Sequence, residues 1–274
     1  MRIGLIGCGR VGIAVVGLLQ RDNKIAGVYD KYKKNERRAT RILHITHNPP
    51  YKELISQSDV LLIATPDDVI LDAFGKMRKY IKGRKYIFHF SGILPAEIIP
   101  KEINIHCASV HPFTTFPEIQ VPSRRRHFQL SIEGNPQAVR IARKIFNKRN
   151  FTLRRITKKE KTLYHLTGVF SSNLLVGLIA AINELASKID WHQEESRELI
   201  FPIIYETLDN IKKFGIRRAL SGPLRRGDVE VVKKHLNALK RDKNLYAIYK
   251  ALSQALVENV IDGKKRRELK RLLR

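Results

Sequence analysis

The sequence predicts an α/β domain built on a mostly parallel sheet, followed by an all-helical domain. Three observations support this. Short apolar segments alternate with helical patterns through the first half of the chain, and a glycine-rich turn follows the first segment. Strand patterns end near Thr157, where long helical patterns begin. We therefore expect one domain over residues 1–156 and a second over residues 157–274.

The expected strands are short apolar runs that end in polar or glycine-containing turns. They lie at residues 3–6, 25–29, 60–64, 86–90, 107–110, 128–132 and 151–155. Helical patterns between them cover residues 13–19, 35–43, 51–56 and 136–147, and a further helix ends at residue 77. Asp67 or Asp68 is expected to cap that further helix. The alternation implies helices on both faces of the sheet.

The second half consists of long helical patterns. Residues 169–181 are apolar and small, which is typical of a helix buried on most sides. Pro202 predicts a kink or break near Phe201, and Asp228 is expected to cap the helix that follows it. The patterns cover residues 158–189, 193–214, 229–240, 244–261 and 264–274.

Composition favours a soluble cytoplasmic protein. The chain has 274 residues, 43% of them hydrophobic, which is enough for two domains with sizeable cores. Its two cysteines, Cys8 and Cys107, and the lack of a signal-like start predict a reduced compartment. No apolar run approaches the roughly 20 residues needed to span a bilayer, so we expect no membrane partner.

The formal net charge of +26 raises the question of nucleic acid as a partner. Lysine and arginine are spread over the whole chain, and no zinc-finger spacing or RNA-recognition signature accompanies them. We therefore expect the basicity to be incidental and nucleic acid not to be a partner. Attraction of anionic cofactors and substrates would be a by-product.

Gly7, Gly9 and Gly12 follow the first strand with the spacing G-x-G-x-x-G. In a dinucleotide site the first glycine permits a tight turn, the second admits the pyrophosphate, and the third lets the helix pack on its strand. The motif predicts a Rossmann-like fold that binds NAD(P)H, with Arg10 and Val11 beside the cofactor. The alternative is a purely architectural turn.

The second strand ends in Asp30, where an acidic side chain would accept hydrogen bonds from the adenosine ribose. A carboxylate repels a 2′-phosphate, so Asp30 favours NAD(H). The cations that follow it could instead bind a 2′-phosphate: Lys31, Lys33, Lys34 and Arg37.

Three further strands end in loops where ligands collect in this architecture: Thr65-Pro66, Ser91-Gly92 and the loop at His111. Histidines are the expected proton carriers, and we expect His111 to line the nicotinamide side of the site. The other histidines of this half are expected to be core, structural or surface residues: His89, His106, His44 and His47.

The first long helix of the second half carries a polar set. Lys161 and His165 are four residues apart and therefore share a face. Ser172 and Asn173 follow further along, and Asn173 needs a partner in so apolar a stretch. Arg226, in the sequence SGPLRRGD, could bind a substrate carboxylate, or the loop could be only a tight turn.

Over nearly its full length the chain resembles Rossmann-like oxidoreductases whose C-terminal half is a helical domain of unknown function, type 2520. These resemble distant relatives of ketopantoate reductase, pyrroline-carboxylate reductase and phosphogluconate dehydrogenase. The matching motifs are GCGRVG (7–12), ATPDD (64–68), HFSGIL (89–94), SVHPFTTF (109–116), YHLTGVFSSN (164–173) and SGPLRRGD (221–228).

The resemblance implies an NAD(P)-dependent reductase or dehydrogenase that forms a homodimer through its helical domain and binds its substrate between the domains. Many relatives have Ser and Arg after the second strand, as NADP-preferring proteins do, whereas this chain has Asp30 and Lys31. The named relatives use a Lys and an Asn on the long helix, and His165 and Asn173 fill these roles by position.

The expected function is hydride transfer between NAD(P)H, with NAD favoured, and a small, carboxylated carbonyl or imine substrate. Asn173 is expected to bind the reacting oxygen, and His165 or His111 to donate the proton. Ser172 and Arg226 are expected to bind the substrate. The alternative is a non-catalytic nucleotide-sensing or nucleic-acid-associated protein on the same scaffold.

Overall fold

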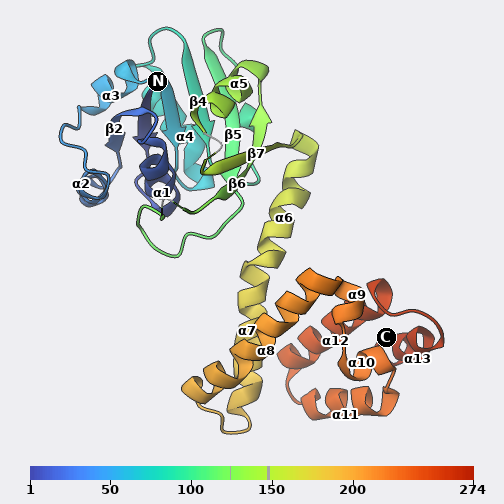
Figure 1. Cartoon of the computed structure of the whole chain (residues 1–274). Coiled ribbons are helices and arrows are strands. Elements are labelled where there is room, and N and C mark those ends of the chain that lie inside the picture. Colours follow the sequence, from blue (N-terminus) through green and yellow to red (C-terminus); the bar gives the residue numbers. More distant parts are fainter. Residues whose placement is uncertain (124, 147–148) are drawn as a thin grey trace. The chain divides into compact units, whose positions relative to one another are not determined.

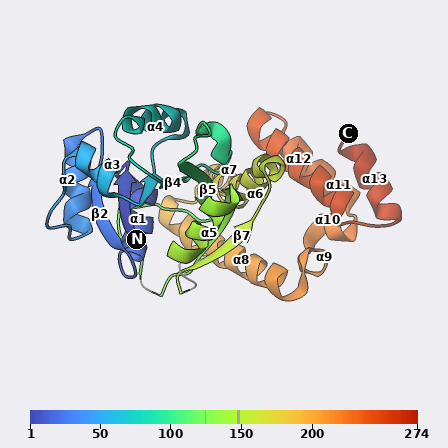
Figure 2. The same cartoon turned by 90° about the horizontal axis from the view of Figure 1, so that it is seen from above.

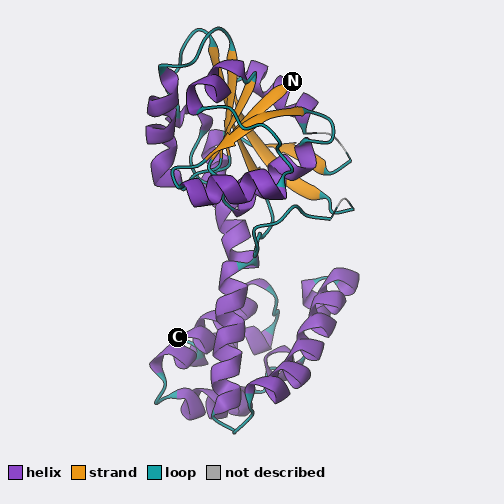
Figure 3. Ribbon diagram, turned by 90° about the vertical axis from the view of Figure 1, so that its left-hand side faces the viewer, coloured by secondary structure: helices purple, strands orange, loops and turns teal. Residues whose placement is uncertain are grey.

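The computed structural model describes residues 1–123, 125–146 and 149–274. The chain forms two compact units, Met1–Ser172 and Asn173–Arg274. Among the described residues, the strands all lie in the first unit, and the second unit is built of helices (Figure 3). The predicted fold class, an α/β part followed by a helical part, is confirmed.

The described part of the first unit contains one sheet with the strand order β2-β1-β3-β4-β5-β6-β7 (Figure 1). The strands are β1 (Arg2–Ile6), β2 (Lys24–Tyr29), β3 (Val60–Ile63), β4 (Lys85–His89), β5 (Ile105–Pro112), β6 (Phe128–Gly134) and β7 (Phe151–Arg155). Only β5 and β6 pair antiparallel in the described sheet. Because the order reverses between β1 and β3, the carboxyl ends of these two strands form the switch point where ligands bind in open α/β sheets.

Helices cover both faces of this sheet (Figure 2). Helices α1 (Arg10–Leu19) and α5 (Pro136–Ile145) share one apolar core with the sheet, to which α2 (Lys33–Ile42) adds Ala39. Helices α3 (Tyr51–Gln57) and α4 (Ile70–Arg78) share the other. Within β3, Leu62 belongs to the first core and Leu61 to the second, because successive strand side chains point to opposite faces.

The predicted cap at Asp67 or Asp68 is wrong. The N-cap residues of the short helix η1 (Asp67–Val69) and of α4 are Pro66 and Val69, and neither makes a side-chain cap. The Asp67 carboxylate instead accepts a hydrogen bond from Ser91 Oγ at 2.7 Å. Helix α5 begins at Pro136 as expected, but Asn147, its predicted end, lies outside the described residues.

The helical half is more finely divided than predicted. The pattern over 158–189 is interrupted at Ser172, which has φ −130° and ψ −71°. Helix α8 runs without a break through Pro202, so the alternative of a break near Phe201 is wrong. The remaining elements are η2 (Ala96–Ile98), η3 (Lys158–Glu160), α6 (Lys161–Ser171), α7 (Asn173–Ser187), α8 (Gln193–Phe214), α9 (Ile216–Ala219), α10 (Gly222–Arg226), α11 (Val229–Leu239), α12 (Lys243–Asn259) and α13 (Lys264–Leu272).

The second unit has its own small core, in which α11, α12 and α13 bury Val232, Val257 and Leu269. Asp228 stands at the N-cap position of α11 but makes no side-chain cap, contrary to our expectation. Its carboxylate accepts a hydrogen bond from Arg226 Nε at 2.7 Å instead. The Arg226 guanidinium therefore binds the Asp228 carboxylate, which would otherwise accept a hydrogen bond from a main-chain N–H group in the first turn of α11.

The last strand, β7, ends at Arg155, so the change from strands to helices near Thr157 is confirmed. The first compact unit nevertheless extends to Ser172, and side chains of α6 are hydrogen-bonded to β5. The functional limits of the two domains stay a prediction.

The apolar middle of the long helical pattern is exposed in the single chain, so the prediction that it is buried on most sides is wrong. Phe170, Leu174 and Val176 are 66%, 50% and 67% exposed. An apolar pattern predicts which side chains are buried but not which part of the protein buries them. By length and composition alone, the helical stretch over residues 158–187 could also cross a membrane, contrary to our expectation. Core helices of soluble proteins meet the same criterion.

Candidate active site

The glycine turn lies at the switch point of the sheet. Gly7 has φ +95°, and a Cβ there would stand 2.7 Å from the Ala64 carbonyl carbon. A Cβ on Gly12 would stand 2.5 Å from the Gly7 carbonyl oxygen. A Cβ on Gly9 would meet nothing within 4 Å. Packing therefore requires the first and third glycines, whereas the second faces open space.

Gly9 is also the N-cap of α1 and offers no side-chain cap to the first turn. The main-chain N–H groups of that turn, from Arg10 to Gly12, point outward at the positive end of the helix. Such an end binds phosphate groups. The Arg10 side chain is exposed and Val11 is half-buried. The turn thus fits the pyrophosphate of a dinucleotide.

Asp30 joins the end of β2 to the glycine turn. Its Oδ2 accepts a hydrogen bond from Cys8 N at 2.8 Å, and its Oδ1 accepts from Tyr32 N at 2.9 Å and Asn35 Nδ2 at 3.1 Å. A carboxylate offers about four acceptor positions, which leaves one for a ribose hydroxyl. Burial, with a smaller effect of Asp30, raises the pKa of the Cys8 thiol to about 12, so Cys8 is a filler.

The loops after β3 and β4 are bonded to each other. Thr65, next to the glycine turn, is half-buried, and Pro66 is exposed. Ser91 Oγ donates to Asp67 and accepts from Leu94 N at 2.9 Å. The Ser91 hydroxyl therefore shapes the loop, and a cofactor would meet this segment through its main chain.

Two predicted proton carriers meet at the end of β5. The His111 and His165 rings lie 6.0 Å apart between centroids. A Cβ on Gly92 would stand 2.9 Å from His111 Nε2 and 2.5 Å from His165 Cδ2. His111 Nδ1 is 3.1 Å from the Tyr164 hydroxyl. Side chains from α6 and the ends of β4 and β5 therefore converge on one spot.

Burial lowers the pKa of His111 to about 4, and His165 and Lys161 act in the same direction. His111 is therefore neutral near pH 7. Its Nδ1 is engaged by Tyr164, and no described residue binds its Nε2. A neutral imidazole with one ring nitrogen held and the other available can exchange a proton with a bound ligand.

Sequence reasoning missed Tyr164 and Ser109, and it did not select Lys161 as a site residue. Lys161 Nζ donates to Ser109 Oγ at 2.6 Å, inside the first unit. The spacing of these residues along the chain could have revealed them. Tyr164 lies three residues after Lys161 on the same helix face, and Ser109 lies two residues before His111 on the same face of its strand.

The residues predicted to contact the substrate make hydrogen bonds within the chain or are exposed. Ser172 Oγ donates to the Gly168 carbonyl at 2.7 Å, within its own helix. Asn173 is exposed and begins the second unit. Arg226 also belongs to the second unit, is exposed, and is paired with Asp228. Their contacts with a substrate stay predictions.

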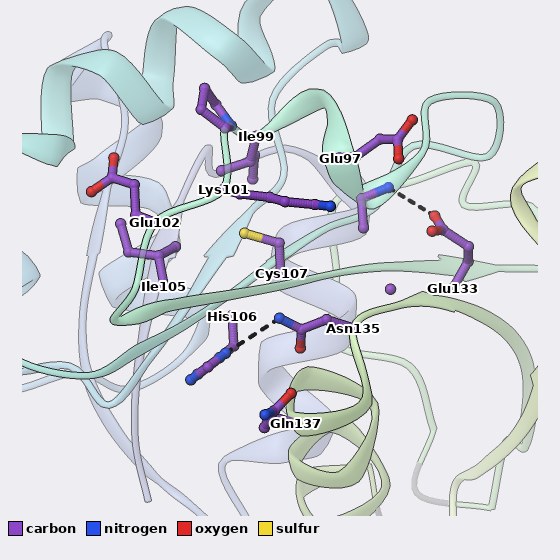
Figure 4. A pocket seen from close by; sticks show the side chains of 13 residues that line it. Glu97, Ile99, Lys101, Glu102, Ile105, His106, Cys107, Glu133, Asn135 and Gln137 are labelled. Carbon is purple, nitrogen blue, oxygen red and sulfur yellow. Dashed lines mark hydrogen bonds between the residues drawn. The ribbon is translucent and has the colours of Figure 1, made fainter.

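His89 and His106 make structural contacts, and His44 and His47 are exposed, as expected. His89 is buried, its Nδ1 accepts from Ser91 N, and its Nε2 donates to the Pro95 carbonyl at 3.2 Å. His106 contacts the Asn135 amide at 3.2 Å. This contact lines a hollow of about 480 Å³ at the opposite end of β5, together with Lys101 and Cys107 (Figure 4). Among the described residues, no group of three or more His, Cys, Asp or Glu could hold a metal ion.

Solved structures share this architecture over most of their length. A protein from Bacteroides fragilis is 19% identical, with 94% of this chain and 98% of that one covered and a TM-score of 0.76. A semialdehyde dehydrogenase NAD-binding protein from Cupriavidus necator, in complex with calcium and NAD, is 16% identical (91% and 98% covered, TM-score 0.65). Pyrroline carboxylate reductase from Plasmodium falciparum, with NADP bound, is 17% identical (93% and 98% covered, TM-score 0.60).

At these identities the likeness shows the fold. No curated protein matches the chain. Residues 128–256 match the family model described as Domain of unknown function (DUF2520). The sheet order and the glycine turn of this chain are those of a Rossmann-like fold, and its residues 128–256 are similar to the DUF2520 family model.

Proposed function

We propose that the protein is an NAD(P)-dependent reductase or dehydrogenase that prefers NAD(H). It acts on a small carbonyl or imine compound that carries a carboxylate. The observation that carries this proposal is the glycine turn at the sheet's switch point, with open space at Gly9 and the His111, Tyr164 and His165 side chains gathered at neighbouring strand ends.

The residues have separate tasks in this proposal. The main-chain N–H groups after Gly9 hold the pyrophosphate, and Asp30 receives a ribose hydroxyl. The Thr65-Pro66 and Ser91-Gly92 segments border the nicotinamide. When bound, the nicotinamide supplies or accepts the hydride. The protein contributes position, exclusion of water and a proton.

His111 is the group best placed to move that proton. Tyr164 fixes the orientation of its ring through Nδ1, and Nε2 lies beside Gly92, where a larger residue would not fit. His165, half-buried on the next turn of α6, faces the same spot. Hydrogen bonding from these rings to a reacting oxygen or nitrogen would assist hydride transfer.

The test is binding and turnover with purified protein. We expect tight NADH binding by fluorescence titration, and cofactor oxidation with a member of a panel of 2-keto acids and cyclic imines. Failure to bind either NADH or NADPH would overturn the proposal. DNA binding at physiological salt without any turnover would favour a nucleic-acid-associated protein instead.

Cofactor preference depends on Asp30. We expect Asp30→Asn to reduce the ratio of NADH to NADPH affinity about tenfold or more, because it removes the negative charge that a 2′-phosphate would meet. Asparagine keeps one oxygen acceptor, so the bond from Cys8 N can persist, whereas the bonds that Oδ1 accepts from Tyr32 N and Asn35 Nδ2 are lost. Asp22→Asn, a carboxylate change before β2, is the matched control. An unchanged ratio would remove Asp30 from cofactor selection.

We also propose that the protein is a homodimer formed through α7 and α8. Large apolar side chains are exposed along both helices, and such patches mark association surfaces in soluble proteins. Two copies of one chain most often associate through a self-complementary interface. The exposed apolar residues are Leu174, Val176, Leu185, Leu199, Ile203, Tyr205, Leu208, Ile211 and Phe214.

Light scattering after size-exclusion chromatography should give twice the mass of the chain. The double variant Val176→Lys with Ile203→Lys should give monomer, because both side chains are exposed in the single chain and would lie in the dimer interface. Ile103→Lys is the control, since Ile103 is 94% exposed and lies in the first unit. A monomeric wild-type protein, or a double variant that stays dimeric, would contradict this interface.

We place the enzyme in the cytoplasm as a soluble protein. Its two thiols support this assignment, because both are free in the structure. Burial raises the pKa of each to about 12.

A further inference from the structure

Lys161 is a charged side chain that lies inside the first unit. It is only 1% exposed, and it is the first residue of α6. Its Nζ donates to Ser109 Oγ at 2.6 Å and to the Ser91 carbonyl at 3.3 Å. It forms no salt bridge with any carboxylate in the described part of the chain. A buried lysine without a directly paired acid is costly and calls for a role.

We propose that Lys161 is a positioning residue that clamps the Ser91–Gly92 turn onto β5 and places a positive charge behind His111. This inference rests on the proposed function for its catalytic consequence. The role of Lys161 in clamping the Ser91–Gly92 turn is inferred from the contacts of the Lys161 ammonium alone.

The clamp acts on one carbonyl. The Ser91 carbonyl oxygen accepts both Lys161 Nζ and Ser109 Oγ, the latter at 3.0 Å. The amide N of Ser91 donates to His89 Nδ1, and its hydroxyl donates to Asp67. The turn that ends β4 is thus held from α6, β5, its own strand and the loop after β3. Gly92, the next residue, is thereby held against His111 and His165.

The clamp also sets the position of α6. Because Tyr164 and His165 follow Lys161 by three and four residues, they lie on the same helix face. Anchoring Lys161 to β5 therefore turns both side chains toward His111, which is two residues beyond Ser109. The contacts of Tyr164 and His165 with His111 are the result.

The effect of the Lys161 charge on His111 depends on the charged and titratable groups around the Lys161 ammonium. Burial lowers the pKa of Lys161 to about 8, and the carboxylates of Glu133 of β6 and Asp67 act in the opposite direction by a smaller amount. The ammonium in turn lowers the pKa of His89 and of His111. The other groups that act on His111 are His165 and the Tyr164 hydroxyl. Lys161 therefore helps to keep His111 neutral near pH 7.

The experiment follows the His111 titration by NMR of protein labelled with ¹³C-histidine, assigned by the signal lost in His111→Asn. In Lys161→Gln, which keeps hydrogen-bonding groups but removes the charge, the His111 midpoint should rise by roughly 0.5 to 1 pH unit. Lys161→Met is the second neutral variant if the glutamine variant fails to fold. Lys161→Arg should leave the midpoint unchanged.

Two further variants separate the clamp from the charge. Ser109→Ala keeps the ammonium but removes its closest acceptor and one donor to Ser91, so kcat should fall on the order of tenfold without a change in the His111 midpoint. Lys159→Gln, an exposed neighbour two residues earlier, should change neither quantity.

An unchanged His111 midpoint in the neutral Lys161 variants would overturn the electrostatic part. A Ser109→Ala enzyme with wild-type kcat would overturn the clamp. The His111 midpoint can be measured whether or not the protein binds NADH, whereas the kcat comparison applies to a wild type that turns over. Failure of the proposed function would be recognised separately, by the absence of cofactor binding in the unaltered protein.

Discussion

Replacing His111 by asparagine is expected to lower kcat on the order of 10²- to 10⁴-fold, the range that a positioned proton carrier contributes. NADH affinity should change little, because the groups proposed to hold the cofactor belong to the glycine turn and Asp30. The reason is local. His111 Nε2 lies beside Gly92, whereas Nδ1 is held by Tyr164. Steady-state kinetics and a fluorescence titration of NADH measure the two quantities.

His106→Asn is the matched control, since His106 lies on the same strand but contacts Asn135 at the opposite end. It should retain wild-type kcat. Tyr164→Phe should lie between the two, because it releases the His111 ring without removing it. If His111→Asn weakens NADH binding as much as it lowers kcat, His111 acts in cofactor binding and not in proton transfer.

Gly9→Val is expected to raise the Kd for NADH about 100-fold or more, which corresponds to about 2.7 kcal/mol. The thermal unfolding midpoint should stay close to that of the wild type. A side chain at this position has room within the protein, since a Cβ meets nothing within 4 Å. It would, however, occupy the space through which the pyrophosphate approaches the main chain.

Gly12→Val is expected to behave in the opposite way. Its Cβ would stand 2.5 Å from the Gly7 carbonyl oxygen, so α1 must move away from β1 and the free energy of unfolding should fall by about 1 to 3 kcal/mol. Differential scanning fluorimetry with and without NADH compares the variants. Equal destabilisation by both would show an architectural turn with no cofactor approach at Gly9.

The elements that the sequence predicted well are those whose signals are local. The strands, the glycine turn and α1 follow from apolar runs and glycine spacing, and the structure has them with bounds shifted by a few residues. Predictions about side-chain partners were less successful. Asp67 and Asp228 have the usual signature of helix caps, yet Asp67 binds Ser91, which is 24 residues away, and Asp228 binds the side chain of Arg226 two residues before it. The partner of Asp67 comes from another strand end, and only folding brings it within hydrogen-bond distance.

The candidate site shows the same division. Sequence position at a strand end selected His111, and helical spacing selected His165, but neither pattern could show that the rings meet at Gly92. Tyr164 was missed because tyrosine in an apolar helix resembles a core residue until its hydroxyl is seen against His111. The exposure of the long helical stretch over residues 158–189 was also missed. Its hydrophobicity predicts burial but does not say whether the same chain or another molecule buries it.

The sequence by itself determined the succession of strands and helices in the first unit, the fold class and the place of the glycine turn. Periodicity and glycine geometry are properties of neighbouring residues, which is why they can be read without coordinates. Only the tertiary structure decided which polar groups meet. Lys161, Ser109 and Ser91 lie far apart in the chain, and their contact depends on α6 packing against the ends of β4 and β5. Burial then sets the protonation of Lys161 and His111, because the cost of a charge depends on the surroundings that the fold provides.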